Sequence, residues 1–306
     1  MRPLGAELID SRQILPGHWL QSWHAPAVAS AARAGQAVHL RTVEAGGLPL
    51  RRPYPVTTVD VASGTITIQV AGSTGPAGGS PPPWARAIRA GDRLDIAGPL
   101  GRPFEVDARA RHLLLIAEGA SIGSLRLLVD EAIRDGRSVV LLFGAISSSA
   151  VYPSSLLPDE VEYIVATADG SLGHRGSVTD IVLDYEAWAD QSFAAGPPAL
   201  LARLSRLAAG RRQRLGVATL GRKRGGGKPL KPGSPEARRK AFLQVALEQT
   251  IGCAAGTCLG CVAPATGSAG SGTGGGGGTV RVCREGPVFA ADELDWERGD
   301  WAGGAA

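Results

Sequence analysis

Short segments in which apolar and polar residues alternate make up much of the first third of the chain. Residues 37–43, 65–70 and 93–97 largely show this alternation, and turn-forming residues separate them. A period of two is typical of β-strands that bury one face. We therefore predict a small antiparallel β-barrel that occupies residues 1–106.

The pattern changes after the barrel segment. Residues 111–117, 138–144 and 162–166 are mostly apolar runs, as in strands of a parallel sheet covered on both faces, and residues 125–133 have helical spacing. This alternation of strands and helices favours a doubly wound α/β nucleotide-binding domain over residues 107–205. In such a domain a dinucleotide binds beside the turn after the first strand, at the N-terminus of a helix.

A basic segment interrupts the chain next. Residues 211–235 carry eight Lys and Arg residues and no acidic residue, which accounts for the net charge of +4. Because glycine and proline are frequent there, we predict that residues 206–240 form a flexible, solvated linker; contact with an acidic partner surface is the alternative. No aromatic residue interleaves with the charges, which argues against stacking on nucleic acid.

Length and composition set wider bounds. A chain of 306 residues suggests two or three domains. It contains no apolar run of about 18 residues, so no membrane span is expected. The N-terminus lacks the apolar segment of a secretory signal, and all four cysteines are clustered, so we expect a reducing, cytoplasmic location.

The cysteines carry the most specific chemistry in the sequence. Cys253, Cys258, Cys261 and Cys283 follow the spacing C-x4-C-x2-C, then 21 residues, then C. A plant-type [2Fe–2S] cluster uses a tight loop of this spacing and a distant fourth thiolate. Zinc, which usually binds two Cys-x2–4-Cys pairs, and two disulfides are the alternatives. We predict a small C-terminal [2Fe–2S] module over residues 241–306.

The sequence around these cysteines also resembles a known family. Residues 244–261 (QVALEQTIGCAAGTCLGC) and 282–289 (VCREGPVF) resemble the C-terminal module of the electron transfer subunit of NAD-dependent (type B) dihydroorotate dehydrogenase, a member of the ferredoxin reductase superfamily. The chain departs from the family in a longer, glycine-rich stretch at residues 267–278. A longer loop adds little closure entropy, so it need not disturb the cluster.

The resemblance implies an FAD site in the barrel. Residues 50–55 (LRRPYP) resemble the R-x-Y-S flavin motif of the superfamily, and residues 91–104 resemble the run that closes its barrel. By this resemblance Arg52 binds the FAD pyrophosphate, as suits a guanidinium, and Tyr54 packs on the flavin. A barrel strand with an exposed arginine pair is the alternative.

Four further residues belong to the implied FAD site. Pro53 and Pro55 complete the motif, and Pro55 replaces the serine that contacts the flavin ring in the family. Proline offers neither a hydroxyl nor an N–H group, so this contact is missing. Gly79 and Ser80 stand near the place where the family has a Gly-Thr pair that holds a phosphate.

The resemblance also implies an NAD site in the α/β domain. Gly119 is retained in the turn after the first strand, whereas Glu118 and Ser121 replace family glycines. Gly196 and Pro197 match a family motif near the nicotinamide. The charge of Glu118 would repel a pyrophosphate, so weak NAD binding is expected, and a structural turn without a ligand is the alternative.

The motifs follow one another in the same order as in the family, and this resemblance implies a function in electron transfer. The resemblance implies a partner, an FMN-containing catalytic subunit that oxidises dihydroorotate, in a heterotetramer of the two subunits. Electrons would pass through the [2Fe–2S] cluster and FAD of this chain to NAD⁺, and this chain would have no catalytic residues for orotate chemistry. A small subunit of an NADPH–ferredoxin transhydrogenase or sulfide dehydrogenase, and a non-catalytic regulatory subunit that keeps the cluster, are the alternatives.

Overall fold

The computed structural model describes six stretches of the chain: residues 4–41, 51–72, 82–214, 234–248, 256–266 and 278–298. The expectations for Gly79, Ser80 and Cys253, and for the middle of the basic segment, concern residues outside these stretches. Within the described stretches, no helix is both long enough and apolar enough to cross a membrane.

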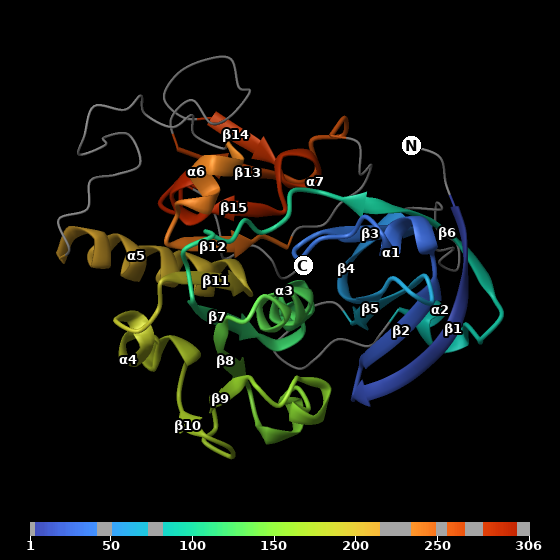
Figure 1. Ribbon diagram of the computed structural model, residues 1–306, viewed down its shortest axis with the longest axis horizontal. Helices are drawn as coiled ribbons and strands as arrows, with labels where there is room; N and C mark the ends of the chain where they lie inside the picture. The colour runs from blue at the N-terminus through green and yellow to red at the C-terminus, as the bar shows by residue number, and fades with distance from the viewer. Residues whose placement is uncertain are drawn as a thin grey trace.

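The first part of the chain forms the closed antiparallel barrel that the sequence predicts (Figure 1). Two short helices, α1 (Pro26–Ala29) and α2 (Pro83–Ala87), accompany it. In the order in which they pair around the barrel, the strands are β1 (Leu4–Leu15), β2 (His18–His24), β5 (Thr65–Ala71), β4 (Arg51–Asp60), β3 (Ala37–Arg41) and β6 (Arg93–Leu100). The alternating pattern places side chains such as Trp23, Leu40 and Ile68 in a fully buried core.

The second part is built on a seven-stranded sheet, which confirms the predicted α/β architecture. In spatial order the strands are β10 (His174–Arg175), β9 (Glu162–Thr167), β8 (Ser138–Ala145), β7 (His112–Glu118), β11 (Gln191–Ala195), β12 (Leu243–Ala246) and β15 (Val288–Ala290). Only β15 runs antiparallel to its neighbour within this sheet. The helices are α3 (Gly123–Arg134), α4 (Val182–Glu186) and α5 (Pro198–Arg214), and a short 3-10 turn (Gly119–Ile122) precedes α3.

The sheet separates two hydrophobic cores. Leu113 and Leu115 on β7 face a core shared with the barrel and α3, whereas Leu114 and Ile116 face a core shared with α5. This alternation follows from the period of two along a strand. Helix α3 lies between the sheet and the barrel, so it joins the two halves of the molecule (Figure 1).

The segment that carries the cysteines is built into the edge of this sheet. Strands β12 and β15 lie on either side of the cysteine loop in sequence and pair with each other as the last strands of the sheet. Strands β13 (Val262–Ala265) and β14 (Gly278–Arg281) form a separate hairpin-like sheet, and helix α7 (Val282–Glu285) follows. The hairpin, with Cys261, packs against the same core as α5.

The basic segment differs from the predicted flexible linker at both of its ends. Helix α5 continues through Arg214, because apolar side chains such as Leu204 and Ala208 recur on its buried face. After the residues outside the described stretches, α6 (Pro235–Arg239) begins with Ser234 as its N-cap. The sequence missed both ends because the many Lys and Arg residues mask a short apolar face.

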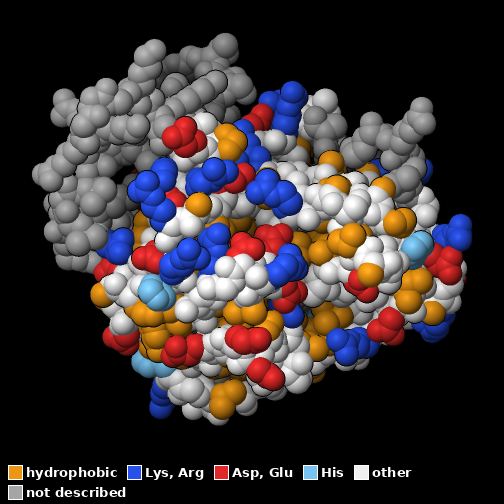
Figure 2. Space-filling model, viewed as in Figure 1, with side chains coloured by type: hydrophobic (Ala, Val, Ile, Leu, Met, Phe, Trp, Pro, Cys, Tyr) orange, Lys and Arg blue, Asp and Glu red, His pale blue; other side chains and the backbone are white. Residues whose placement is uncertain are grey.

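Helix α6 is tied to the segment that connects the barrel with the sheet. Lys and Arg side chains gather on this face of the molecule, over α6 (Figure 2). Arg239 lies 3.1 Å from the buried carboxylate of Glu105, and Lys240 lies 2.7 Å from Asp107. These ion pairs give the C-terminal end of residues 206–240 a structural role.

Candidate functional site

The described part of the cysteine loop brings two of the expected ligands together. The backbone N–H of Cys283 donates to the sulfur of Cys261 over 3.4 Å, and the N–H of Gly260 donates to the sulfur of Cys258 over the same distance. Cys261 is buried and Cys258 is exposed. A third hydrogen bond, from Val282 N to Cys261 O (2.9 Å), holds the loop against α7.

The donor set fits an iron–sulfur cluster. Among the described residues, Cys258, Cys261 and Cys283 form no disulfide. Backbone N–H groups directed at sulfur stabilise thiolate ligands and tune a cluster's potential. Cys253, the fourth expected ligand, lies outside the described residues. Among the residues that are described, no three His, Cys, Asp or Glu side chains approach closely enough to enclose a metal ion.

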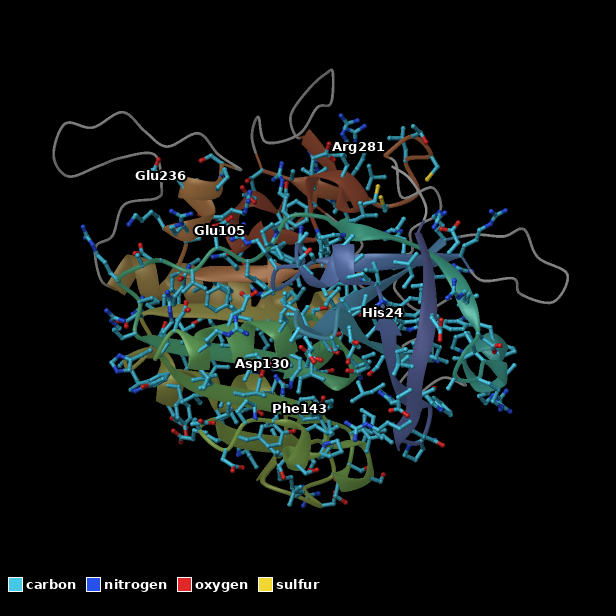
Figure 3. The ribbon with its side chains drawn as sticks, turned by 45° about the vertical axis from the view of Figure 1, so that its right-hand side comes forward. His24, Glu105, Asp130, Phe143, Glu236 and Arg281 are labelled. Atoms are coloured by element: carbon cyan, nitrogen blue, oxygen red, sulfur yellow. The ribbon has the colours of Figure 1, made fainter. Side chains whose placement is uncertain are left out.

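An arginine, Arg281, connects the cysteine loop with α7. Arg281, labelled in Figure 3, ends β14, and its Nη1 donates to the carbonyl oxygen of Gly256 over 3.0 Å. Its Nε and Nη2 donate to both carboxylate oxygens of Glu285 on α7, at distances of 2.5–3.2 Å. Sequence reasoning did not single out either side chain, because neither is a ligand and their pairing depends on the turn between β14 and α7.

The flavin motif lies on β4, where Arg51 precedes Arg52. Arg51 forms an ion pair with Asp95 on β6 at 2.5 Å, so it has a structural role in the barrel. Arg52 stands next to it on a strand whose following residues, Pro53 and Tyr54, pair with β3. The ring of Tyr54 is only 9% exposed and meets Trp84 edge to face, with a centroid distance of 5.7 Å.

The other end of the motif meets the N-terminus of α3. A Cβ atom built on Gly123 would lie 3.2 Å from Pro55 Cγ and 3.1 Å from Gln69 Oε1. Both Gln69 Oε1 and Trp84 Nε1 are buried without a hydrogen-bond partner among the described residues. Trp84 lies beside Tyr54, and Gln69 and Pro55 both lie beside Gly123, so these unsatisfied polar atoms fit a site that a polar, planar group completes. Pro55 itself offers no donor.

The carboxyl ends of the parallel strands bring the expected NAD residues to one edge of the sheet. Gly119 has a left-handed φ of +57°, and a Cβ atom built on it would meet no heavy atom within 4 Å. Gly196, directly after β11, is buried and would place a Cβ atom 3.6 Å from that of Glu118. Pro197 follows it and is exposed, just before α5 begins.

Glu118 occupies the middle of this edge. It ends β7, with Gly144 on one side and Gly196 on the other, and a Cβ atom built on Gly144 would lie 3.4 Å from its Cγ. Burial raises the pKa of Glu118 above its usual range. The acidic side chain therefore stands between two glycines, where the fold would bring a pyrophosphate close to the backbone.

A second carboxylate at this edge escaped the sequence reasoning as a site residue. Glu248, just after β12, hydrogen-bonds with the hydroxyl groups of Ser121 and Ser124 at the start of α3. Glu248 as a whole is exposed, yet the surrounding protein buries its carboxylate and raises the pKa of Glu248. The hydrogen bonds from Ser121 and Ser124 oppose this shift. No local pattern could reveal this cluster, because its members are far apart in the sequence.

Two of the family-like motifs touch each other. The N–H of Arg102 donates to the carbonyl oxygen of Gly286 over 2.7 Å, and a Cβ atom built on Gly101 would lie 2.4 Å from Pro287 Cδ. The run that closes the barrel thus packs on the segment directly after Cys283. This contact joins the cysteine module to the flavin motif's own domain.

Comparison with known proteins finds relatives of this chain. The model of the iron–sulfur cluster binding domain of dihydroorotate dehydrogenase B matches residues 248–295. A protein of Geobacillus thermodenitrificans (strain NG80-2), named dihydroorotate dehydrogenase B (NAD(+)), electron transfer subunit, is 29% identical over 269 residues, which cover 87% of this chain and 88% of the relative. The chain is a relative of these electron transfer subunits.

A further relative agrees with this relationship, and solved structures share the fold. The subunit of the same name from Desulforamulus reducens (strain ATCC BAA-1160 / DSM 100696 / MI-1) is 26% identical over 95% of this chain and 98% of its own length. The structure of an NADH-dependent reduced ferredoxin-NADP oxidoreductase covers 95% of this chain and 90% of its own, with a TM-score of 0.69 and 22% identity. The ferredoxin reductase of a carbazole 1,9a-dioxygenase covers 68% and 65%, with a TM-score of 0.57 and 19% identity. These structures confirm the ferredoxin reductase-like fold.

Proposed function

We propose that this protein is the electron transfer subunit of an NAD-dependent dihydroorotate dehydrogenase B. The relatives of that name match this chain over most of their length, and the model of their iron–sulfur domain matches the cysteine segment. The observation that carries the proposal is the contact of Gly101 and Arg102 with Gly286 and Pro287, which seats the cysteine module on the barrel. When bound, the [2Fe–2S] cluster and FAD supply the one-electron and two-electron chemistry.

The cysteine module holds and screens the cluster. Cys253, Cys258, Cys261 and Cys283 are the proposed ligands. The N–H groups of Gly260 and Cys283 donate to ligand sulfurs, which favours the thiolate form. The burial of Cys261 against the α5 core keeps water from one side of the site.

The barrel and the start of α3 orient FAD. Arg52 is proposed to bind the pyrophosphate of FAD. Gly79 and Ser80 are proposed to contact a phosphate as well. The flavin is proposed to be lined by Pro53, Tyr54 and Pro55. Gln69 Oε1, an acceptor, and Trp84 Nε1, a donor, are buried polar atoms that a flavin ring would satisfy.

NAD⁺ is proposed as the electron acceptor, bound at the carboxyl edge of the sheet. Gly119 leaves open space for the pyrophosphate at the N-terminal side of α3, and Gly196 and Pro197 border the same edge. The charge of Glu118 weakens this binding. Glu118 is also the feature that favours the second candidate function, a regulatory subunit that keeps the cluster without NAD turnover.

The partner subunit completes the reaction. We propose that an FMN-containing catalytic subunit oxidises dihydroorotate and delivers electrons to the exposed Cys258 side of the loop, in a heterotetramer of both subunits. The described cysteines of the module form no disulfide, which suits a reducing compartment, and we propose that the complex is cytoplasmic.

Reconstitution with the catalytic subunit tests this function. The complex should form NADH from dihydroorotate and NAD⁺, whereas the catalytic subunit alone should not. A Cys283→Ser variant is the matched control and should abolish NADH formation while the catalytic subunit still reduces an artificial acceptor. Reduction of ferredoxin or oxidation of sulfide in place of dihydroorotate turnover would identify the transhydrogenase or sulfide dehydrogenase alternative. No turnover and no NAD⁺ binding by a cluster-loaded chain would identify the regulatory one.

A further inference from the structure

Arg281 makes an unusually complete set of hydrogen bonds beside the proposed cluster. Its guanidinium donates to both carboxylate oxygens of Glu285, and the backbone N–H of Arg281 donates to the same carboxylate over 2.6 Å. The remaining Nη1 donates to Gly256 O over 3.0 Å. A planar fork of this kind fixes the orientation of the side chain, which a lysine could not do.

These bonds connect the two segments that carry the cysteines. Gly256 lies in the loop between Cys253 and Cys258, and Glu285 lies on α7 two residues after Cys283. A Cβ atom built on Gly256 would lie 3.1 Å from Arg284 Cδ and 3.6 Å from Arg281 Nη1, so the loop passes directly against this side chain. Arg281 therefore bridges the loop and α7.

The pair also places opposite charges next to the proposed ligands. Cys261 and Cys283 both interact electrostatically with Arg281. The side chains of Arg281 and Glu285 are only 21% and 20% exposed, so solvent screens their charges less than those of a surface pair. A [2Fe–2S] cluster on four thiolates is anionic and becomes more so on reduction, so a nearby cation favours the reduced form and a nearby anion opposes it.

We propose that Arg281 and Glu285 form a balanced charge pair that sets the reduction potential of the cluster, with Arg281 as the positioning residue for the Gly256 loop. This inference rests on the proposed cluster site and goes beyond it. Neither side chain is a ligand. Arg281 acts through its charge and through the loop it holds, and Glu285 acts by holding Arg281 and by offsetting its charge.

Redox titration of purified, cluster-loaded variants tests the proposal. Iron and sulfide content is measured first, and the midpoint potential is then followed by electron paramagnetic resonance. Arg281→Gln leaves Glu285 uncompensated, so the equilibrium constant for reduction should fall by about tenfold, which is 59 mV for one electron. Glu285→Gln leaves Arg281 uncompensated, so the potential should move in the opposite direction. Arg281→Lys keeps the charge and loses the fork, so the potential should stay near that of the wild type while a chelator removes iron faster.

The control is the exposed pair Arg93–Glu7 on the barrel, whose closest atoms are 2.8 Å apart. Arg93→Gln should change neither the potential nor the rate of iron loss. If Arg281→Gln fails to retain the cluster, the positioning role is supported and Glu285→Gln decides the role of charge. Loaded Arg281→Gln and Glu285→Gln proteins with the wild-type potential, or with shifts in the same direction, would overturn the proposal. Wild-type protein without iron and sulfide would instead refute the cluster site itself, which the first measurement distinguishes.

Discussion

His39 lies inside the barrel, with 3% of its surface exposed, and its Nδ1 has no hydrogen-bond partner among the described residues. Burial, aided by the nearby charge of Arg51, lowers its pKa from 6.5 to about 4. The folded protein therefore holds this histidine neutral at pH values where the unfolded chain protonates it. At the same scale, Glu118 is an acid whose burial raises its pKa. Each shift leads to a measurable pH dependence.

The first prediction concerns acid stability. Because the folded pKa of His39 lies below the unfolded value, the free energy of unfolding should fall as pH decreases from 6.5, with the loss complete below about 4. The full loss in the free energy of unfolding is about 3 kcal/mol. Urea unfolding at a series of pH values measures it. His39→Leu should flatten this part of the profile, whereas the same change at His24, exposed at the end of β2, should not. An equally steep profile in His39→Leu would refute the assignment.

The second prediction concerns Glu118 and NAD⁺. Glu118→Gln removes the charge and keeps the shape, so NAD⁺ affinity should rise by about tenfold, corresponding to about 1.4 kcal/mol. Since the pKa of Glu118 is raised, its protonation on acidification should also strengthen NAD⁺ binding to the wild type, and this pH dependence should disappear in the variant. Calorimetric titration measures both effects. Tight wild-type binding without a gain in the variant would show that the pyrophosphate lies elsewhere.

At the scale of elements, two buried glutamines attach the connecting segment to the sheet. Gln244 on β12 accepts from Glu105 N over 2.9 Å and donates to Glu105 O. Gln191 on β11 accepts from Asp107 N over 2.9 Å and donates to Ala241 O over 3.0 Å. The strands thus satisfy the backbone of the segment that leads from barrel to sheet, which would otherwise be buried without partners.

The third prediction tests this attachment. Gln244→Leu fills a similar volume and leaves Glu105 N–H buried without its partner, so the free energy of unfolding should fall by about 1–3 kcal/mol. Denaturant unfolding measures the loss. Gln13→Leu is the control, because Gln13 is exposed and its side chain donates to the carbonyl oxygen of Leu15, two residues away. Equal stability of both variants would mean that Gln244 does not hold the segment.

Elements with a strong local pattern could be predicted, and contacts between distant segments could not. Periodicity predicts the barrel strands β3, β5 and β6, the sheet strands β7, β8 and β9, and helix α3, and spacing predicts the cysteine loop, because both signals lie within a few residues. Strands β1 and β2 were not predicted. The end of α5 was missed because its last four residues, 211–214, carry three Arg residues and no apolar residue. The Glu248 cluster and the Arg281–Glu285 bridge were missed because they arise only when the sheet edge and the hairpin are assembled.

At the scale of the whole molecule, a contact between Gly101 and Pro287 helps to join the cysteine module to the barrel. Gly101 has a φ of +91°, and a Cβ atom there would lie 2.4 Å from Pro287 Cδ. Nearby, Arg102 N donates to Gly286 O over 2.7 Å. Because Gly286 follows Cys283 closely and Gly101 follows the flavin-domain strands, this contact fixes the proposed cluster relative to the proposed flavin.

The fourth prediction tests the contact with a matched pair of glycines. Gly91 has the same φ of +91°, but a Cβ atom there would meet no heavy atom within 4 Å. Gly91→Ala should therefore cost only the left-handed conformation, about 1–2 kcal/mol. Gly101→Ala should cost more, and it should also slow reduction of the cluster by NADH in stopped-flow experiments. Equal effects of the two substitutions on stability and on cluster reduction would show that the Gly101–Pro287 contact is unimportant.

We propose that this chain connects a [2Fe–2S] cluster, through a flavin, to a nicotinamide cofactor. The most direct test adds NADH to anaerobically purified, cofactor-loaded protein and follows flavin absorbance together with the electron paramagnetic resonance signal of the reduced cluster. The protein should contain equal amounts of iron and acid-labile sulfide, and NADH should bleach the flavin and produce a [2Fe–2S] signal. In Cys261→Ser the iron, the sulfide and the [2Fe–2S] signal should be lost, whereas NADH should still bleach the flavin. Stoichiometric zinc without iron, or a loaded cluster that NADH leaves oxidised, would contradict this proposal.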